Sequence, residues 1–382
     1  MKVSFIGLGK LGMPCAETIA KRGWNIVNGY DISEKKSKFV KIKKNLADAV
    51  KGAEIVFVAT PTPHDNDYGG EKPVSHLEPK DFNYSSVIEV LKQCNNLMNK
   101  KQLLVLVSTV LPGTTRKHFA PLVTKTNFVY NPYLIAMGTV KEDFLNPEMI
   151  MIGTEKGGKS KQALKLTEFY KNVLGHEPRI EYCTWDECEA IKIFYNTFIS
   201  TKIALVNMIQ DVAVKNGNIN VDNVTKALSA STNRIISPKY MTAGMGDGGS
   251  CHPRDNIALR WLSKRLNLNY DIFSAIIEAR EMQAKNMATE ILKHGKVIHF
   301  TSDSYKPGTT MTDGSYSLLV QHYIRELGGV VSYGFGQPID VHVLTHPGDS
   351  VELSDGKGII FDPWRKYPKG SNVIHYGDND NV

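Results

Sequence analysis

Three glycines stand directly after a short apolar run at the start of the chain, at Gly7, Gly9 and Gly12. Residues 2–6 have the composition of a buried strand, and residues 10–22 have the apolar spacing of a helix. Glycines in this Gly-x-Gly-x-x-Gly spacing let the backbone turn tightly and approach a pyrophosphate, which rests on the N-terminus of the helix. The spacing therefore predicts a βαβ unit that binds a dinucleotide.

An acidic residue, Asp31, follows the second expected strand at 25–30. A carboxylate in this place accepts hydrogen bonds from the adenosine ribose and repels a 2′-phosphate, which favours NAD over NADP. Lys35 and Lys36 lie close by and weaken this preference. The residues expected to contact NAD are Gly7, Gly9, Leu11, Gly12, Asp31, Lys36, Thr60, Pro61 and Thr109.

The first half of the chain alternates expected strands, at 54–59, 103–107, 127–130 and 149–152, with helical segments. This alternation is typical of an α/β fold, here a Rossmann-type doubly wound parallel sheet with helices on both faces. Thr60–Pro63 and Ser108–Thr114 follow two of the strands. Ligands of open α/β sheets bind beyond the carboxyl ends of the strands, although such segments are more often ordinary loops.

The middle of the chain is mostly helical. Apolar residues at helical spacing predict one long helix from Asp186 to Asn216, ended by Gly217. Strands and helices alternate again from about Lys296, with expected strands at 297–300, 330–333, 341–344, 358–361 and 373–376. We therefore expect a NAD-binding domain at 1–184, a central long-helix region at 185–294 and a smaller α/β domain at 295–382; the resemblance described below implies dimerisation for the second and sugar-nucleotide binding for the third.

A glycine-rich stretch at 245–255 delivers Cys251 just before Pro253, a residue that favours the first position of a helix. A thiol at a helix N-terminus is made nucleophilic by the helix dipole, and Asp255 lies four residues on, on the same face. A lone cysteine is more often a small buried hydrophobe. The preceding glycines and the helix start favour a catalytic role for this one.

On the long helix, Lys192 and Asn196 are four residues apart and share a face among apolar neighbours. Most lysines are merely solvated, but a half-buried lysine beside an amide can stabilise an alkoxide. With Cys251, the pair suggests oxidation of an alcohol and capture of the aldehyde on sulfur. A second oxidation would then give a thioester that water cleaves, so that two NAD are consumed.

Bulk properties narrow the class of protein. The net charge of +7 favours anionic small ligands, and the basic residues lack the pattern of a nucleic-acid groove. Five cysteines without regular spacing predict neither disulfides nor a metal site. With no signal-peptide pattern and no apolar run near ~18 residues, we expect a cytoplasmic protein without a membrane segment.

These segments together resemble the UDP-glucose/GDP-mannose dehydrogenase family, from Met1 to about Tyr333. The motifs that carry the resemblance are GLGKLGMP at the start, VATPTP at 58–63, STVLPGT at 108–114, EAIKIFYNTFISTKIALVN at 189–207, GGSCHPRD at 248–255 and a degraded SYKPGTT at 304–310. The resemblance implies NAD as cofactor, a nucleotide sugar as substrate, with UDP-glucose the default, and a homodimer built on the central helices.

The resemblance also implies roles for single residues. Cys251 would be the nucleophile, Lys192 and Asn196 would hold the oxyanion, and Asp255 would order water or tune the thiol. Thr109 would touch the reacting centre. Contacts to the sugar nucleotide are implied for Arg234, Tyr240, Gly248 and Lys306.

The sequence departs from the family pattern in two places. Family members carry two glutamates in a segment like NPEFLxEG, the first of which acts in thioester hydrolysis; here Tyr133 and Met137 stand in their places. The family's arginine after the KP motif is replaced by Asp313. Two alternatives stay open. One is a single-step β-hydroxyacid dehydrogenase, since such enzymes also pair a dinucleotide fold with a helical Lys and Asn; the other, which the lost glutamates favour, is a sugar-nucleotide-binding protein with degenerate catalysis.

Overall fold

The structure is a computed structural model that describes residues 1–23, 26–63, 77, 80–136, 138–237, 242–245, 256, 260, 262–333, 338–353 and 358–378. The chain divides into two compact units, Met1–Thr201 and Lys202–Val382, and each is described here by itself. The predicted division into three domains at 184 and 294 stays a prediction.

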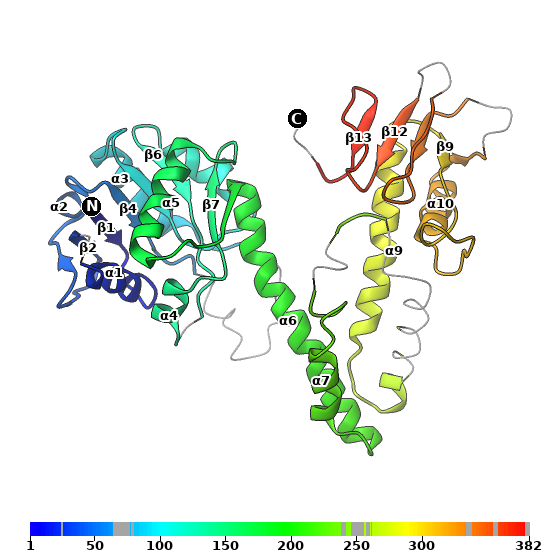
Figure 1. Ribbon diagram of the computed structural model, residues 1–382, viewed down its shortest axis with the longest axis horizontal. Coiled ribbons are helices and arrows are strands. Elements are labelled where there is room, and N and C mark those ends of the chain that lie inside the picture. The colour runs from blue at the N-terminus through cyan, green and yellow to red at the C-terminus, as the bar shows by residue number, and fades with distance from the viewer. Residues whose placement is uncertain are drawn as a thin grey trace. The chain divides into compact units, whose positions relative to one another are not determined.

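The first unit is built on an eight-stranded sheet with the strand order β3-β2-β1-β4-β5-β6-β7-β8 (Figure 1). The strands are β1 (Lys2–Ile6), β2 (Ile26–Tyr30), β3 (Lys41–Ile42), β4 (Ile55–Val58), β5 (Leu103–Leu106), β6 (Asn127–Tyr130), β7 (Ile150–Thr154) and β8 (Ile180–Thr184). The predicted strands agree with these bounds to within about two residues. The short β3 and the half-buried β8 were not predicted, because neither is an apolar run.

Helices pack on both faces of this sheet, which confirms the predicted doubly wound α/β class. One apolar core joins the sheet to α1 (Gly12–Lys21) and α5 (Lys161–Leu174). The other joins it to α2 (Leu46–Val50) and α3 (Ser85–Leu97). Every residue of β4 and β5 is buried, as expected for central strands covered on both sides.

The sheet differs from the expected all-parallel arrangement at one pair. β6 pairs with β7 antiparallel, through Tyr130 and Gly153, whereas β7 and β8 are parallel to each other. The connection from β6 runs through a loop and the short helix α4 (Val140–Leu145). The six strands β1 to β6 are mutually parallel, so their carboxyl ends share one edge.

The long helix predicted for 186–216 is confirmed as α6 (Trp185–Asn216), and Gly217 ends it with φ +71°. By length and composition α6 is one helix of the described chain that could cross a membrane. Long core helices of soluble proteins meet the same two criteria, so this finding alone assigns no membrane.

The second unit holds α7 (Val221–Ser229), α9 (Ile272–Ile291), α10 (Tyr316–Glu326) and a parallel sheet ordered β10-β9-β11-β12-β13. Its strands are β9 (Val297–Phe300), β10 (Val330–Val331), β11 (Val341–Val343), β12 (Ile359–Asp362) and β13 (Val373–His375). They match the strands predicted for this region. Helical residues are also described at 256, 260 and 262–265.

Candidate active site

A cleft of about 840 Å³ lies beyond the carboxyl ends of the parallel strands of the first unit. This is where ligands bind in open α/β folds. The predicted residues that the structure brings together on its wall are Gly7, Gly9, Leu11, Asp31, Thr60, Pro61, Thr109 and Lys192, and they are joined by Lys10, Lys35, Ser108, Tyr133 and Ile135.

The glycine turn after β1 forms one end of the cleft. Gly7 adopts φ +92°, and a Cβ there would lie 2.7 Å from the Ala59 carbonyl oxygen. Gly12 opens α1, and its Cβ would lie 2.0 Å from the Gly7 carbonyl oxygen. A Cβ on Gly9 would meet nothing within 4 Å. The first and third glycines are therefore required by packing, while the second leaves open space for a ligand.

Asp31 follows β2 beside this turn. Its Oδ2 accepts a hydrogen bond from the Leu8 backbone N–H at 2.7 Å, and its Oδ1 accepts from the N–H and hydroxyl of Ser33. Partial burial acts to raise the pKa of the carboxyl, but the hydrogen bonds from Ser33 and Leu8 outweigh it, so the pKa is lowered. Asp31 is thus an ionised acceptor at neutral pH.

Replacing Asp31 with asparagine is expected to weaken NAD binding by about 10- to 100-fold, since a hydrogen bond to a charged group contributes ~1.5–3 kcal/mol. The ratio of the affinities for NAD and NADP should fall as well. Titration calorimetry with both dinucleotides measures this. Glu34→Gln is the matched control, because Glu34 is exposed and pairs with Lys36 at 3.6 Å. Equal affinities of native and Asp31→Asn protein for NAD would contradict the assignment.

The predicted contact of Lys36 with the cofactor is not supported by its position. Its side chain is exposed, forms the ion pair with Glu34 and does not line the cleft. Lys35 lines the cleft instead. Neighbouring lysines in a loop give no periodic signal that distinguishes which of them faces a ligand.

The strand ends at 60–63 and 108–114 are tied together across the middle of the cleft. The Ser108 hydroxyl donates to the Thr60 carbonyl oxygen at 2.5 Å, and the Thr62 hydroxyl donates to the Thr109 carbonyl oxygen at 2.7 Å. The Thr60 hydroxyl is buried without a hydrogen-bond partner among the described residues. A buried orphan hydroxyl on a cleft wall is suited to pair with a ligand.

A buried carboxylate that the sequence analysis missed positions α6 against this edge. Glu189 accepts from the backbone N–H groups of Gly113 at 2.6 Å and Thr115 at 2.7 Å, and burial raises its pKa. Glu189 stands between Cys188 and Ala190 among several charged residues, so little in the sequence signals its burial. The contact fixes the helix one turn before Lys192.

Lys192 is 9% exposed, and burial lowers the pKa of its ammonium group. Within the described chain its Nζ has no hydrogen-bonding or ionic partner, although it lines the cleft. One turn further along α6, Asn196 is exposed and does not line the cleft. The structure therefore places one member of the predicted pair in the site.

Tyr133 occupies the position of the first family glutamate and lines the same cleft. Its hydroxyl lies 3.1 Å from that of Tyr170, which also bonds to the Asn131 side-chain oxygen. Burial raises the pKa of Tyr133 well above its usual range. The side chain is therefore a neutral phenol at this end of the cleft.

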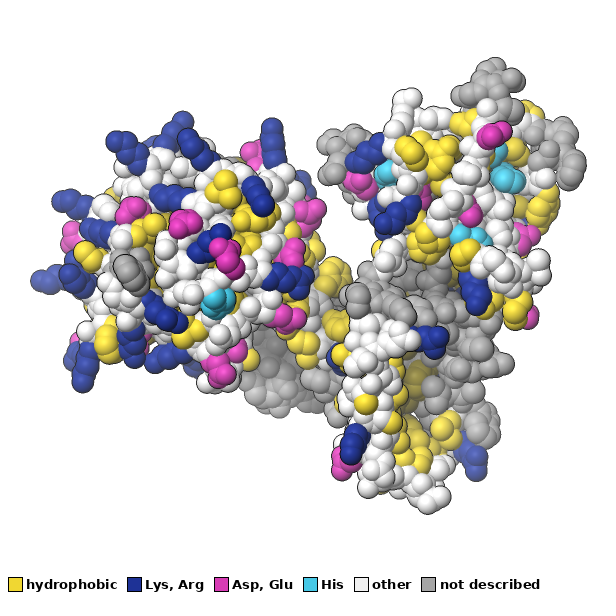
Figure 2. All heavy atoms as spheres, in the orientation of Figure 1, with side chains coloured by type: hydrophobic (Ala, Val, Ile, Leu, Met, Phe, Trp, Pro, Cys, Tyr) yellow, Lys and Arg dark blue, Asp and Glu magenta, His cyan; other side chains and the backbone are white. Residues whose placement is uncertain are grey.

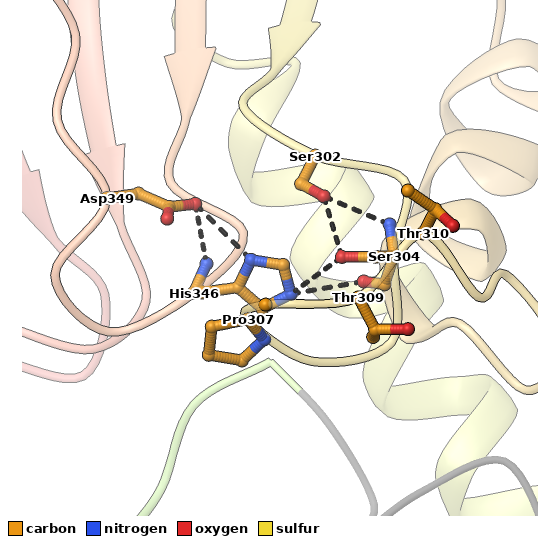
Figure 3. A pocket seen from close by; sticks show the side chains of 8 residues that line it. Ser302, Ser304, Pro307, Thr309, Thr310, His346 and Asp349 are labelled. Atoms are coloured by element: carbon orange, nitrogen blue, oxygen red, sulfur yellow. Dashed lines mark hydrogen bonds and ion pairs between the residues drawn. The ribbon is translucent and has the colours of Figure 1, made fainter.

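The second unit has a pocket of its own, of about 700 Å³, shown in Figure 3. It lies beyond the ends of β9 and β11, where the strand order reverses, a usual site for ligands. Its wall consists of Ser302, Ser304, Pro307, Gly308, Thr309, Thr310, His346 and Asp349.

His346 forms the buried part of this pocket. Its Nδ1 lies 3.5 Å from Asp349 Oδ2, and its Nε2 lies 3.1 Å from the Ser304 carbonyl oxygen. The Asp349 carboxylate also accepts from the His346 backbone N–H at 2.9 Å. These bonds hold the two loops together and leave hydroxyl groups of the pocket wall for a polar ligand.

Several predicted site residues are not brought to either pocket. Lys306 is exposed, with its Nζ 5.3 Å from the centre of the Tyr305 ring, and Arg234 and Asp313 are also exposed. Within the described ranges no group of three or more His, Cys, Asp or Glu could hold a metal ion. Tyr240, Gly248, Cys251, Asp255 and Met137 lie outside the described residues.

Comparisons with known proteins agree with this architecture. Models of the UDP-glucose/GDP-mannose dehydrogenase family match residues 34–174, as the NAD binding domain, and 186–281, as the central domain. The UDP-glucose 6-dehydrogenase of Rickettsia prowazekii is 26% identical over 339 residues, which cover 81% of this chain and 75% of that protein. That of Campylobacter jejuni is 28% identical over 316 residues, 77% and 75% of the two chains.

Among solved structures, a GDP-mannose dehydrogenase from Pseudomonas aeruginosa has a TM-score of 0.82 and 20% identity, covering 98% of this chain and 99% of its own. A UDP-glucose dehydrogenase from Pyrobaculum islandicum has a TM-score of 0.51 and 19% identity, covering 96% and 94%. These likenesses show a shared fold.

Proposed function

The chain belongs to the UDP-glucose/GDP-mannose dehydrogenase family of NAD-dependent nucleotide-sugar dehydrogenases, and we propose that it oxidises C6 of a nucleotide sugar, UDP-glucose first, to a carboxylate. The observation that carries the proposal is the single cleft that joins the glycine turn and Asp31 to Thr109 and Lys192. The cleft therefore places a dinucleotide site and the buried Lys192 amine at the same edge of the sheet, beyond the carboxyl ends of the strands.

The residues of the cleft fit NAD. The open space at Gly9 can hold a pyrophosphate, and the ionised Asp31 carboxylate can accept hydrogen bonds from a ribose. The buried Thr60 hydroxyl has no hydrogen-bond partner among the described residues and can bond to the cofactor. When bound, NAD accepts a hydride in each of two oxidations. The chain's own part is to orient the alcohol, take up its proton and exclude water.

Lys192 and Cys251 carry the proposed chemistry on the substrate. The Lys192 amine would hold the oxygen at C6 as the alcohol loses its proton. The Cys251 sulfur would add to the resulting aldehyde, and the thiohemiacetal, after its own oxidation, becomes a thioester. Water would cleave the thioester and release the carboxylate.

The pocket of the second unit suits the nucleotide end of the substrate. Its wall carries the hydroxyls of Thr309 and Thr310, and phosphate oxygens accept such bonds well; the Ser302 and Ser304 hydroxyls are bonded to each other, and that of Ser304 donates to the Lys306 carbonyl oxygen. We place a nucleotide diphosphate there.

Replacing Thr310 with valine removes one hydroxyl of this wall and keeps the side-chain shape. We expect the dissociation constant of UDP to rise about 10-fold, in the range of one lost hydrogen bond to a charged group. Thr312→Val is the matched control, since Thr312 is an exposed threonine of the same loop that does not line the pocket. Titration of the native protein and of each variant with UDP and GDP measures the dissociation constants. An unchanged affinity in Thr310→Val would place the nucleotide elsewhere.

An apolar face of α6 is proposed as the interface of a homodimer. Phe194, Phe198 and Leu205 are 66%, 52% and 42% exposed and share one face of the helix by their spacing. Exposed apolar patches of this kind mark protein interfaces. On the face drawn in Figure 2, by contrast, Lys and Arg of the first unit are interspersed with acidic side chains.

We also propose a cytoplasmic location.

Phe198→Asp is expected to convert the dimer to a monomer, because a charge would be buried without a partner in the interface. Sedimentation velocity measures the mass in solution. Val214→Asp is the control: Val214 is 77% exposed but lies on the opposite side of α6 by helical spacing. A Phe198→Asp protein that remains a dimer would move the interface away from α6.

The experiment that tests the function is a panel of nucleotide sugars with NAD, followed by the absorbance of NADH. Oxidation of UDP-glucose, or of another sugar of the panel, supports a dehydrogenase. A panel without NADH formation at saturating NAD and sugar would favour a binding protein.

A further inference from the structure

We propose that His299 and His342, on the sheet of the second unit, form a binding site for a divalent metal ion of the kind that imidazole prefers, such as Zn²⁺. The two side chains come from the neighbouring strands β9 and β11 and meet at the same ring atom, Nδ1. The inference does not depend on the proposed dehydrogenase activity, and the cleft of the first unit has no part in it.

The pairing of the strands places both histidines on one face of this sheet. β9 and β11 are parallel, and His342 stands opposite His299 in their register. The flanking residues Ile298, Phe300 and Val343 point to the other face, where they share an apolar core with α9 and α10. The imidazoles therefore project from the face opposite to this core, and both side chains are half-buried.

The distance between the two ring nitrogens fits a metal ion. Nδ1 of His299 lies 3.2 Å from Nδ1 of His342, and the ring planes are inclined to each other by 67°. Two nitrogens that each lie ~2.0–2.1 Å from Zn²⁺ in tetrahedral geometry are separated by roughly 3.3 Å. Small rotations of the rings are therefore enough to bind an ion between them, without movement of either strand.

The charge state of the imidazoles also suits a metal ion. Half-burial lowers the pKa of both histidines, and the neighbouring His299 lowers that of His342 further. Both rings are therefore neutral at pH 7.5, as metal ligands must be. The negative charge of Asp303 acts on His299 in the opposite direction, which means that it attracts a cation to this place.

Without a metal ion the two nitrogens share one hydrogen bond. One Nδ1 carries the hydrogen and donates it to the other, and within the described chain neither imidazole makes a further hydrogen bond. When an ion binds, the donor ring exchanges its proton from Nδ1 to Nε2 through solvent, so no proton is released in total. Two metal–nitrogen bonds replace the one hydrogen bond. Since the described residues supply no third His, Cys, Asp or Glu ligand, water fills the remaining positions.

The first test is calorimetric titration of the full chain with Zn²⁺ at pH 7.5, comparing the native protein with His342→Gln. Glutamine keeps a hydrogen-bonding group beside His299 but removes one imidazole ligand. Because the second imidazole binds an ion that the first already holds, we expect the affinity for one equivalent of Zn²⁺ to fall by about 100-fold or more.

His322→Gln is the matched control. His322 is exposed on α10 of the same unit, and its Nε2 lies 3.8 Å from a carboxylate oxygen of Glu326. This variant also loses one imidazole but keeps the pair on β9 and β11, so it should bind Zn²⁺ with the native affinity and stoichiometry.

The second test locates the ion by amide hydrogen exchange, and it decides the matter if His342→Gln does not fold. Binding of Zn²⁺ across β9 and β11 should slow the exchange of the amides of these two strands in the native protein, because it opposes their local separation. The same strands of His299→Gln should exchange equally fast with and without Zn²⁺.

Equal affinity and stoichiometry for Zn²⁺ in the native protein and His342→Gln would overturn the proposal, since the ion would then bind elsewhere. Exchange in β9 and β11 of the native protein that is unchanged by saturating Zn²⁺ would overturn it as well. Neither result bears on the proposed function, which the panel of nucleotide sugars tests separately.

Discussion

Replacing Cys251 with serine is expected to abolish formation of the carboxylate while NAD binding is preserved. A serine hydroxyl is a far weaker nucleophile toward the aldehyde than a thiolate. The loss of a covalent nucleophile typically lowers kcat by more than about 10³-fold. At most one NADH per sugar should form, and the product should be an aldehyde or its hydrate, which mass spectrometry identifies.

Cys183→Ser is the matched control for this variant. Cys183 is a free, half-buried cysteine on β8 whose thiol is hydrogen-bonded to Cys188, and it does not line the cleft. The buried thiols of Cys15 and Cys94 have their pKa raised to about 12 by burial and are unreactive. Carboxylate formation at the native rate by Cys251→Ser would contradict the covalent mechanism, whereas loss of activity in Cys183→Ser would indicate a general effect of thiol removal.

Gly12→Ala is expected to cost both stability and NAD binding. The added Cβ would lie 2.0 Å from the Gly7 carbonyl oxygen, and that oxygen belongs to backbone that cannot move without opening the turn. Overpacking of this kind destabilises a protein by ~1–3 kcal/mol or more. Urea unfolding and NAD titration should show a lower free energy of unfolding together with little or no binding.

Gly9→Ala separates the two effects. A Cβ at this position meets no atom within 4 Å, so the free energy of unfolding should change by less than about 1 kcal/mol. The same Cβ occupies the space where the pyrophosphate approaches the backbone, so NAD affinity should fall strongly. NAD affinity that is retained in Gly9→Ala would show that the pyrophosphate does not lie over this turn.

The fold was largely predictable from local patterns. The buried strands are continuous apolar runs, so their composition predicted them. Helix α6 was predicted from the helical spacing of its apolar residues between Ile191 and Val212. The antiparallel pairing of β6 with β7 was not predictable, because strand direction depends on the path of the chain through α4 rather than on the strand's own residues.

The site was predictable where a residue type is required by backbone geometry or stands at a strand end. Gly7, Asp31, Thr60 and Thr109 were predicted for this reason, and all four line the cleft of the first unit. Side-chain orientation was not predictable from spacing, which is why Lys35 lines the cleft in place of Lys36. The network that locks Tyr133 joins residues from three segments, and no single segment of the sequence contains that signal.

The most direct test of the account is to count NADH formed for each nucleotide sugar consumed by the native protein, with the product identified by mass spectrometry. The account predicts two NADH and a uronate. One NADH with an aldehyde or ketone product would contradict the four-electron mechanism, and consumption without NADH would remove the chain from dehydrogenase chemistry.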